Sequence, residues 1–306
     1  MSTSRAVVLA RGLGTRMRQA DPGVQLSEAQ QRAADAGLKA MMHVNGRPFL
    51  DYVLSTLADA GITDVALVVA PDHEAVRQYY ATLAPPARIR LDYVVQQEPR
   101  GTADAVLGAE TWAGGGMFLA MNADNLYPAG AIADLARLSE PGLPAFDRDD
   151  LVRCGNIPLD RIKSFALIDV DEQGYLTGII EKPPENPPTP NPTARAERVR
   201  PVPRERSERA PTGERSEPAP TEARTTEAPI LISMNCWHFD SRIFAACRDV
   251  PRSVRGEFEL PEAVGVAIAR GVRFRALPAH GAVLDLSRRA DAAEVERRLT
   301  GIVPRP

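Results

Sequence analysis

Residues 6–17 read AVVLARGLGTRM, a short apolar run that breaks into a loop containing two glycines. The β-branched and aliphatic residues of 6–10 predict a buried strand, which Gly12 and Gly14 then end. Glycine lets a backbone bend sharply and approach a ligand, and the exposed N–H groups of such a loop suit a phosphate. Arg16 adds a fixed positive charge with a planar set of donors. The segment therefore predicts a binding loop for nucleotide phosphates.

Two widespread glycine motifs do not fit this loop. A dinucleotide-binding fingerprint requires a third glycine or alanine where this chain has Met17, and a P-loop requires Gly-Lys followed by Ser or Thr. A turn that ends a strand and carries a surface arginine is the simpler alternative, and the loop alone does not decide between the two. The choice depends on the rest of the chain.

Composition places the chain among globular proteins. It has 306 residues, of which 44% are hydrophobic and 25% charged, enough for one large domain or two small ones. The formal net charge of -3 argues against a general nucleic-acid- or membrane-binding surface. No apolar run is long enough to span a bilayer, and Arg11 and Arg16 interrupt the apolar segment near the N-terminus. We therefore expect no membrane partner, no nucleic-acid partner and no signal peptide.

Cysteine and histidine usage indicates a reducing compartment and gives no sign of a zinc site. The three cysteines, Cys154, Cys236 and Cys247, are scattered and form no C-x-x-C pattern, as expected of free thiols. The four histidines show no metal-ligand spacing. We therefore expect a cytoplasmic protein, and the sequence leaves open whether it forms a homo-oligomer.

Strands and helices alternate through the first half of the chain. The predicted strands cover 64–70, 89–95 and 116–121, and the predicted helices cover 49–60, 71–83, 102–112 and 129–139. Ser27 is expected to cap a further short helix, and Asp72 to cap the helix that starts at 71. This order is typical of an α/β fold with a mostly parallel sheet flanked by helices, where ligands bind beyond the carboxyl ends of the strands. Arg16, Gln96 and Asp124 each follow a strand, so we expect them to share one crevice.

The second half continues the same domain around a segment of different character. Residues 184–229 are rich in proline, arginine and glutamate and contain no leucine, isoleucine or aromatic residue, which predicts a disordered insertion. Further strands are predicted over 162–171, 175–180, 230–235, 272–277 and 282–286, with helices over 241–248, 259–270 and 290–299. We therefore predict a single domain over residues 1–183 and 230–306, with 184–229 as a solvated tether.

With these segments placed, the chain resembles the sugar-phosphate nucleotidyltransferase family, also called the sugar-nucleotide pyrophosphorylases. The resemblance covers most of residues 5–300, apart from insertions around 18–38 and 184–229. Its pieces, in chain order, are LARGLGTRM (9–17), Lys39, QQEPRGTA (96–103), Asp124 in ADN, Glu181-Lys182-Pro183, Asn235, GEFEL (256–260) and Asp285. Each piece is weak alone, and their shared order along one chain makes the match strong.

The resemblance implies a Rossmann-like sheet of the glycosyltransferase-A kind and a defined reaction. A sugar-1-phosphate oxygen would attack the α-phosphate of a nucleoside triphosphate, and pyrophosphate would leave. Because the nucleophile is already anionic, catalysis consists of positioning and charge neutralisation. Arg16, Lys39 and Asp124 would be catalytic, and Mg²⁺ would bind Asp124 and Asp285. The implied nucleotide contacts are Ala10, Gly12, Gly14, Thr15, Gln96, Gly101 and Thr102, and the implied sugar-phosphate contacts are Glu181, Lys182 and Asn235.

The residues expected to contact the base favour a pyrimidine. The amide of Gln96 offers both a donor and an acceptor to the edge of uracil or thymine. Gly101 has no side chain, so a base can lie close to its backbone. We therefore predict UTP or dTTP as the nucleotidyl donor. The acceptor is less defined, because the residues do not identify the sugar and leave a phosphorylated alcohol open.

Several residues depart from the family pattern. Arg11 replaces a small residue in the signature loop, Ala40 replaces a proline, and Ala166 replaces a glycine at the substrate. Cys236-Trp237 replaces a Thr-Gly pair near the sugar. Of these departures, Arg11 and Cys236-Trp237 favour an alternative, a non-catalytic nucleotide- or sugar-binding regulatory homologue of the same fold. The retained residues that favour an enzyme instead are Arg16, Lys39, Asp124 and Lys182.

Overall fold

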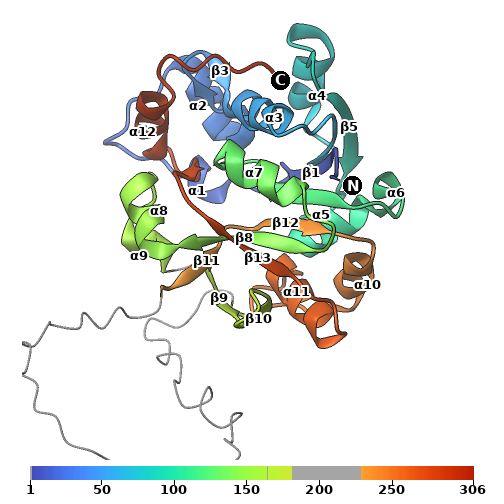
Figure 1. The fold of residues 1–306 in the computed structure, drawn as a ribbon. Helices are drawn as coiled ribbons and strands as arrows, with labels where there is room; N and C mark the ends of the chain where they lie inside the picture. Colours follow the sequence, from blue (N-terminus) through green and yellow to red (C-terminus); the bar gives the residue numbers. More distant parts are fainter. Residues whose placement is uncertain (1, 164, 181–228) are drawn as a thin grey trace, which may run out of the picture. The chain divides into compact units, whose positions relative to one another are not determined.

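The computed structural model of the chain describes residues 2–163, 165–180 and 229–306 (Figure 1). Met1–Pro183 and Ile230–Pro306 form one compact unit, and the domain boundary drawn from the sequence stays a prediction. Nearly all of the predicted insertion over 184–229 lies outside the described residues. Glu181 and Lys182 lie outside them too, so their role stays a prediction.

Four parallel strands form one half of the main sheet. They are β1 (Arg5–Leu9), β4 (Asp64–Val69), β5 (Arg90–Val95) and β6 (Phe118–Asn122), in the spatial order β6-β1-β4-β5. β1 and β4 are buried on both faces, which explains why their sequences are almost continuously apolar. Because all four strands run the same way, their carboxyl ends meet at one edge of the sheet.

Antiparallel pairing extends this sheet beyond β6 in the order β10-β9-β11-β8-β12-β6. β13 runs parallel to β8. The strands are β8 (Gly142–Asp147), β9 (Ala166–Val170), β10 (Leu176–Ile180), β11 (Leu231–Ser233), β12 (Cys236–Phe239) and β13 (Arg275–Ala279). The predicted α/β fold, with a mixed sheet flanked by helices, is confirmed. Shorter strand pairs are β2 (His43–Val44) with β3 (Arg47–Pro48), and β7 (Asn125–Leu126) with β14 (Leu284–Asp285).

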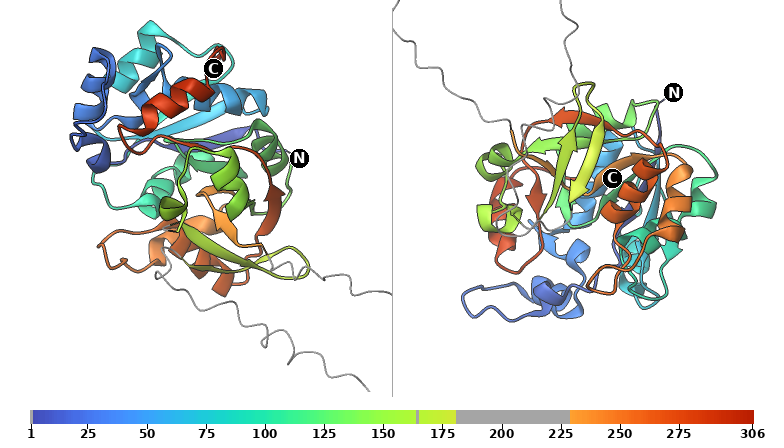
Figure 2. Two further views of the ribbon diagram at one scale, coloured as in Figure 1. Left: turned by 90° about the vertical axis from the view of Figure 1, so that its left-hand side faces the viewer. Right: turned by 90° about the horizontal axis from the view of Figure 1, so that it is seen from below.

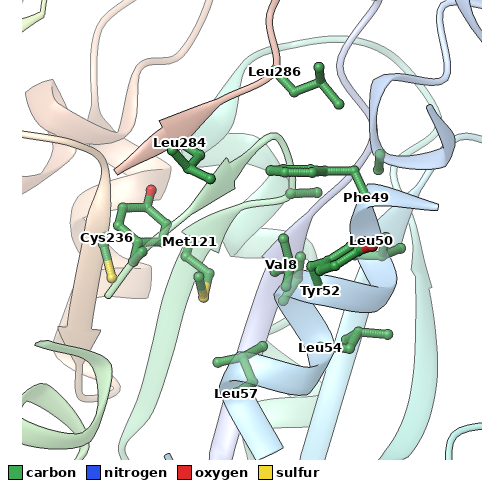
Figure 3. Close-up of a cluster of buried hydrophobic side chains, with 14 of the residues drawn as sticks. Val8, Phe49, Leu50, Tyr52, Leu54, Leu57, Met121, Cys236, Leu284 and Leu286 are labelled. Carbon is green, nitrogen blue, oxygen red and sulfur yellow. The ribbon is translucent and has the colours of Figure 1, made fainter. Parts of the chain in front are cut away.

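Helices cover both faces of the sheet (Figure 2). Side chains alternate along a strand, so Val8 joins one hydrophobic cluster and Val7 the other. The Val8 cluster contains α3, whose Phe49 and Leu54 pack with Val8 and Met121 (Figure 3). The longer helices that contribute to it are α2 (Glu28–Ala36), α3 (Phe49–Asp59), α7 (Ala129–Ala136) and α12 (Asp291–Arg298). Those of the Val7 cluster are α5 (Thr102–Gly108), α6 (Glu110–Ala113), α10 (Arg242–Asp249) and α11 (Leu260–Ala269). The remaining short helices are α1 (Thr15–Arg18), α4 (Glu74–Gln78), α8 (Arg148–Cys154), α9 (Leu159–Ile162), η1 (Lys39–Met41) and the π-helical η2 (Tyr79–Leu83).

The segment over residues 18–38 folds as a helix held to the rest of the domain. Ser27 caps α2 as predicted, because its hydroxyl accepts from the Gln30 N–H while the Gln30 side chain accepts from the Ser27 N–H. The guanidinium of Arg289 then donates to the Met17 carbonyl and to Asp35. This insertion is therefore part of the domain's packing.

Several predicted boundaries are wrong. The helix predicted to start at 71 with Asp72 as its cap starts at Glu74 with His73 at the N-cap position, and no described side chain caps it. The helix predicted over 102–112 breaks at Ala109 into α5 and α6. Ile162 ends helix α9 instead of starting a strand. The prediction also missed β8, α8, α9 and β12.

All three cysteines are free thiols, as predicted. Burial raises the pKa of Cys247 to about 12 and raises that of Cys236 still further, whereas Cys154 is only half-buried. We therefore expect iodoacetamide at pH 8 to label the folded protein at Cys154 alone, and all three cysteines in urea. Intact mass and peptide mapping measure the sites. Rapid labelling of Cys236 in the folded protein would contradict this packing.

Candidate active site

An open cavity of about 530 Å³ lies at the edge of the sheet where the parallel strands end. Its lining follows the order of the strands. Gln96 comes after β5, Gly12 after β1 and Asp124 after β6, while Ser233 and Ala166 belong to β11 and β9. The structure brings together in this lining the predicted residues Ala10, Gly12, Gly14, Thr15, Arg16, Lys39, Gln96, Gly101, Thr102, Asp124 and Asn235. The shared crevice expected from the sequence is therefore present.

The two glycines of the loop after β1 have different roles. Gly14 has a φ of 61°, and a Cβ there would lie 2.2 Å from the carbonyl oxygen of Gly37 at the end of α2. A side chain is therefore excluded at Gly14 by backbone conformation and packing. Gly12 has open space where its Cβ would stand, so that space is left for a ligand. Among the described residues, no backbone acceptor pairs with the N–H groups of residues 11–14, which leaves them available for phosphate oxygens.

Lys39 and Asp124 form an ion pair in the lining of the cavity. The Nζ of Lys39 donates to Oδ2 of Asp124 at 3.0 Å, and each side chain is 23% exposed. The Asp124 carboxylate raises the pKa of Lys39, so this amine stays charged despite its burial. Arg16 is close enough to act in the opposite direction on the same pKa. The pocket therefore places two positive charges beside the loop amides, which suits a polyphosphate.

Asp285 lies behind the cavity wall. β14 pairs with β7, which sets Asp285 opposite Asn125, the residue after Asp124. Its Oδ2 accepts from Asn125 and Ser287, both at 3.0 Å. Burial raises the pKa of Asp285 to about 6, and the neighbouring Asp124 carboxylate adds to this rise.

The two carboxylates fit a magnesium ion. Asp285 is 4% exposed, and its Oδ1 accepts no hydrogen bond from any described residue, although Nη2 of Arg161 lies 3.4 Å away. A hard cation between Asp124 and Asp285 would relieve their repulsion, and Mg²⁺ commonly takes one or two protein carboxylates with phosphate oxygens. Among the described residues there is no cluster of three or more His, Cys, Asp or Glu side chains that could hold a metal by themselves.

Gln96 presents only one of its two polar atoms to the cavity. Its Nε2 donates to the Gly101 carbonyl at 3.0 Å and to the Asp104 carboxylate at 2.7 Å. Both partners are acceptors, so the amide cannot flip. The expectation that Gln96 offers a ligand both a donor and an acceptor therefore needs correction, since Oε1 alone remains for it.

Gly101 and Thr102 form the cavity wall for a different reason from the one expected. Gly101 has a φ of 114°, and a Cβ there would lie 2.4 Å from the Phe258 carbonyl oxygen. Thr102 accepts from the Leu260 N–H at 2.9 Å through its hydroxyl. Glycine is thus required at 101 because this turn packs directly on the segment 258–260.

Comparison with known proteins identifies the family. A model of the nucleotidyl transferase family matches residues 5–285. The chain belongs to this family. The UTP–glucose-1-phosphate uridylyltransferase AglF of Haloferax volcanii is 26% identical over 296 residues, which cover 96% of each chain. A glucose-1-phosphate thymidylyltransferase of Streptomyces antibioticus is 27% identical over 295 residues, covering 96% of this chain and 65% of that one.

A UDP-glucose pyrophosphorylase complexed with UDP-glucose has the same fold, with a TM-score of 0.67 at 14% identity. The alignment covers 97% of this chain and 98% of that one. Together with the curated relatives, the family match makes this nucleotidyl transferase a member of the enzymes of class EC 2.7.7 that act in sugar-nucleotide biosynthesis.

The structure adds lining residues that were not predicted as site residues. Arg255, Glu257 and Glu259 reach the cavity from the loop before α11, and Arg255 forms an ion pair with the buried Glu259. The GEFEL segment (256–260) was the signal that could have identified Glu257 and Glu259, and Arg255 directly precedes it.

Arg11 and Trp237, the departures that favour the non-catalytic alternative, do not block the loop at residues 11–14 of this nucleotidyl transferase. The Arg11 guanidinium turns away from the loop amides to the carbonyls of Gln96 and Gln97, both at 3.4 Å. Trp237 is fully buried in the Val7 cluster and does not line the cavity. Neither side chain therefore occupies the space beside Gly12.

Proposed function

We propose that this chain transfers a nucleotidyl group from UTP or dTTP to a sugar-1-phosphate, releasing pyrophosphate and forming an NDP-sugar. The observation that carries the proposal is the sequence of groups along the cavity. Across the carboxyl ends of the strands, Gln96 after β5 is followed by the loop amides after β1, which no described backbone acceptor pairs, then by the Lys39–Asp124 pair, and finally by Asn235 just before β12. In the proposal, Gln96 receives the base, the loop amides and Lys39 receive the triphosphate, and Asn235 receives the sugar phosphate. The match to uridylyl- and thymidylyltransferases supports the same assignment.

The chemistry requires charge neutralisation and alignment. An oxygen of the sugar phosphate forms a bond to the α-phosphorus while the bond to the pyrophosphate oxygen breaks, so no proton has to move. In the proposed roles, the loop amides and Arg16 bind the β- and γ-phosphates, and Lys39 binds the α-phosphate. Each fixed charge stabilises the negative charge that builds up on the transferred phosphoryl group. Glu181, Lys182 and Asn235 are proposed to hold the sugar phosphate.

Mg²⁺ is the proposed cofactor, held by Asp124 and Asp285. When bound, it would neutralise phosphate charge and orient the triphosphate. Asp285 would act from behind the wall, where Asn125 and Ser287 fix its carboxylate. No described helix has the length and hydrophobicity needed to cross a bilayer. A cytoplasmic location is part of the proposal, in line with the free thiols.

A nucleotide panel tests the proposal. Pyrophosphate release is measured with UTP, dTTP, CTP, GTP and ATP, each with several sugar-1-phosphates and phosphocholine. We expect UTP or dTTP to give the highest kcat/KM, because Oε1 of the fixed Gln96 amide can accept from the N3–H of uracil or thymine. Gln96→Ala should lower kcat/KM for the preferred donor by about tenfold. Preference for a purine would refute the base assignment.

The same assay decides the alternative. A regulatory homologue would bind nucleotides and release no pyrophosphate with any pair of substrates. Arg11→Ala is the matched variant, because it removes the most prominent departure from the signature loop without touching Gly12 or Arg16. If the parent protein released no pyrophosphate and the Arg11→Ala variant did, the regulatory homologue would be favoured.

A further inference from the structure

Three asparagine side chains join into one chain of hydrogen bonds along the cavity. Asn235 donates from Nδ2 to Oδ1 of Asn122 at 3.0 Å. Asn122 donates from Nδ2 to Oδ1 of Asn125 at 3.4 Å, and Asn125 donates to Oδ2 of Asp285 at 3.0 Å. At the other end, the indole Nε1 of Trp237 donates to Oδ1 of Asn235 at 2.9 Å. All three asparagines line the cavity.

The two ends fix the direction of every bond between them. An indole N–H can only donate, so Asn235 must turn its oxygen to Trp237 and its nitrogen to Asn122. A carboxylate can only accept, so Asn125 must turn its nitrogen to Asp285. Flipping any one amide would set donor against donor or acceptor against acceptor. Bonds aligned head to tail also polarise one another, so the chain resists rearrangement at each link.

The backbone at Asn235 supports the same interpretation. β11 and β12 both pair with β8, yet Leu231 and His238 lie seven residues apart while their partners Asp147 and Gly142 lie five apart. The extra residues between Leu231 and His238 form a bulge that contains Asn235, whose φ is 58°. A left-handed conformation is uncommon outside glycine, and bulges re-aim side chains beside sites. The strand is thus bent where it presents Asn235 to the cavity.

Trp237 cannot itself contact a ligand. It is fully buried among Phe239, stacked at 5.7 Å between ring centroids, and Phe274 at 6.2 Å. The one polar atom of its side chain, the indole Nε1, donates to Asn235. We propose that Trp237 is a positioning residue that fixes the amide of Asn235 for sugar-phosphate binding and, through Asn122 and Asn125, ties that amide to Asp285. This inference rests on the proposed function.

The test is a double-mutant cycle. Trp237→Phe removes the indole N–H and keeps an aromatic ring in the core. Asn235→Gly removes the amide and keeps a residue that readily adopts positive φ. We expect Trp237→Phe to raise KM for the sugar phosphate by about three- to tenfold with KM for the nucleotide unchanged. In the Asn235→Gly background, Trp237→Phe should add nothing.

Trp112→Phe is the matched control, since Trp112 is the second of two tryptophans and its Nε1 donates to Asp92 at the same 2.9 Å, outside the cavity. It removes the same N–H and should leave both KM values unchanged. Unchanged kinetics in Trp237→Phe, or an effect that persists in the Asn235→Gly background, would overturn the proposal.

A readout independent of turnover separates this inference from the proposed function. The chain has two indole ¹H–¹⁵N signals, and the one lost in Trp237→Phe is that of Trp237. Asn235→Gly should shift this signal and speed its exchange with solvent, leaving the Trp112 signal in place. If the parent turned over no sugar phosphate, the proposed function would fail, and this spectrum would still decide the positioning role. An unmoved Trp237 signal overturns it.

Discussion

Asp124→Ala is expected to lower kcat by roughly a thousandfold while the fold survives. The substitution removes a proposed Mg²⁺ ligand and the acceptor of the Lys39 amine at 3.0 Å. Asp124 lies at the cavity surface with a 23% exposed side chain, so no core packing is lost and water can solvate Lys39. Pyrophosphate release measures the rate, and thermal unfolding followed by circular dichroism measures the fold.

Two further variants separate the metal role from the ion pair. Lys39→Ala leaves both carboxylates in place, so it should lower kcat without raising the Mg²⁺ concentration needed for half-maximal rate. Asp124→Ala should raise that concentration. Asp134→Ala is the control, because Asp134 of α7 is 60% exposed and its ion-pair partner within the described chain is Arg137, at the end of the same helix. Activity of Asp124→Ala within a few-fold of the parent would rule out the metal role.

Local patterns were enough to predict most of the site. The apolar run before Gly12 required a strand, and the strand ends before Gln96 and Asp124 had to meet because parallel strands share one edge. Residues placed by this rule, Arg16 among them, do line the cavity. Topology therefore brought together side chains that lie far apart in the sequence.

Contacts between distant segments were not predictable in the same way. Position 101 requires glycine because a Cβ there would collide with the backbone of Phe258, far along the chain. The residues around 101 do not indicate this contact. The β12 strand was missed because the bulge at Asn235 interrupts its pattern. The sequence places Trp237 near the sugar, whereas its burial depends on Phe239 of the same strand and on Phe274, just before β13. For Gly101 and Trp237, a deciding partner, Phe258 or Phe274, therefore lies far along the chain.

The second large effect is expected on stability, and it comes from a buried carboxylate outside the cavity. Asp51 in α3 is fully buried. Its Oδ2 accepts from Arg47 at 2.7 Å and from the Tyr79 hydroxyl at 3.1 Å, and its Oδ1 accepts from the Tyr80 hydroxyl at 2.9 Å. Burial raises the pKa of Tyr79 to about 12 and that of Tyr80 well above its ordinary value, so both phenols stay protonated donors. One side chain thus joins α3 to η2.

Asp51→Ala is therefore expected to lower the free energy of unfolding by about 3 kcal/mol. Most of the cost comes from Tyr80, which is 3% exposed and would keep a buried hydroxyl without its acceptor. Arg47 contributes less, because 42% of its side chain is exposed and its charge stays hydrated. Urea unfolding followed by circular dichroism measures the change.

Asp59→Ala is the matched control on the same helix. Asp59 pairs with Arg88 at 2.7 Å, but its side chain is 54% exposed, so the loss should stay within about 0.5 kcal/mol. Neither residue lines the cavity, and both variants should keep the parent's specific activity below their unfolding transitions. Equal destabilisation by the two substitutions would contradict this expectation, because Asp51 is buried with three donors whereas Asp59 is exposed with one ion-pair partner.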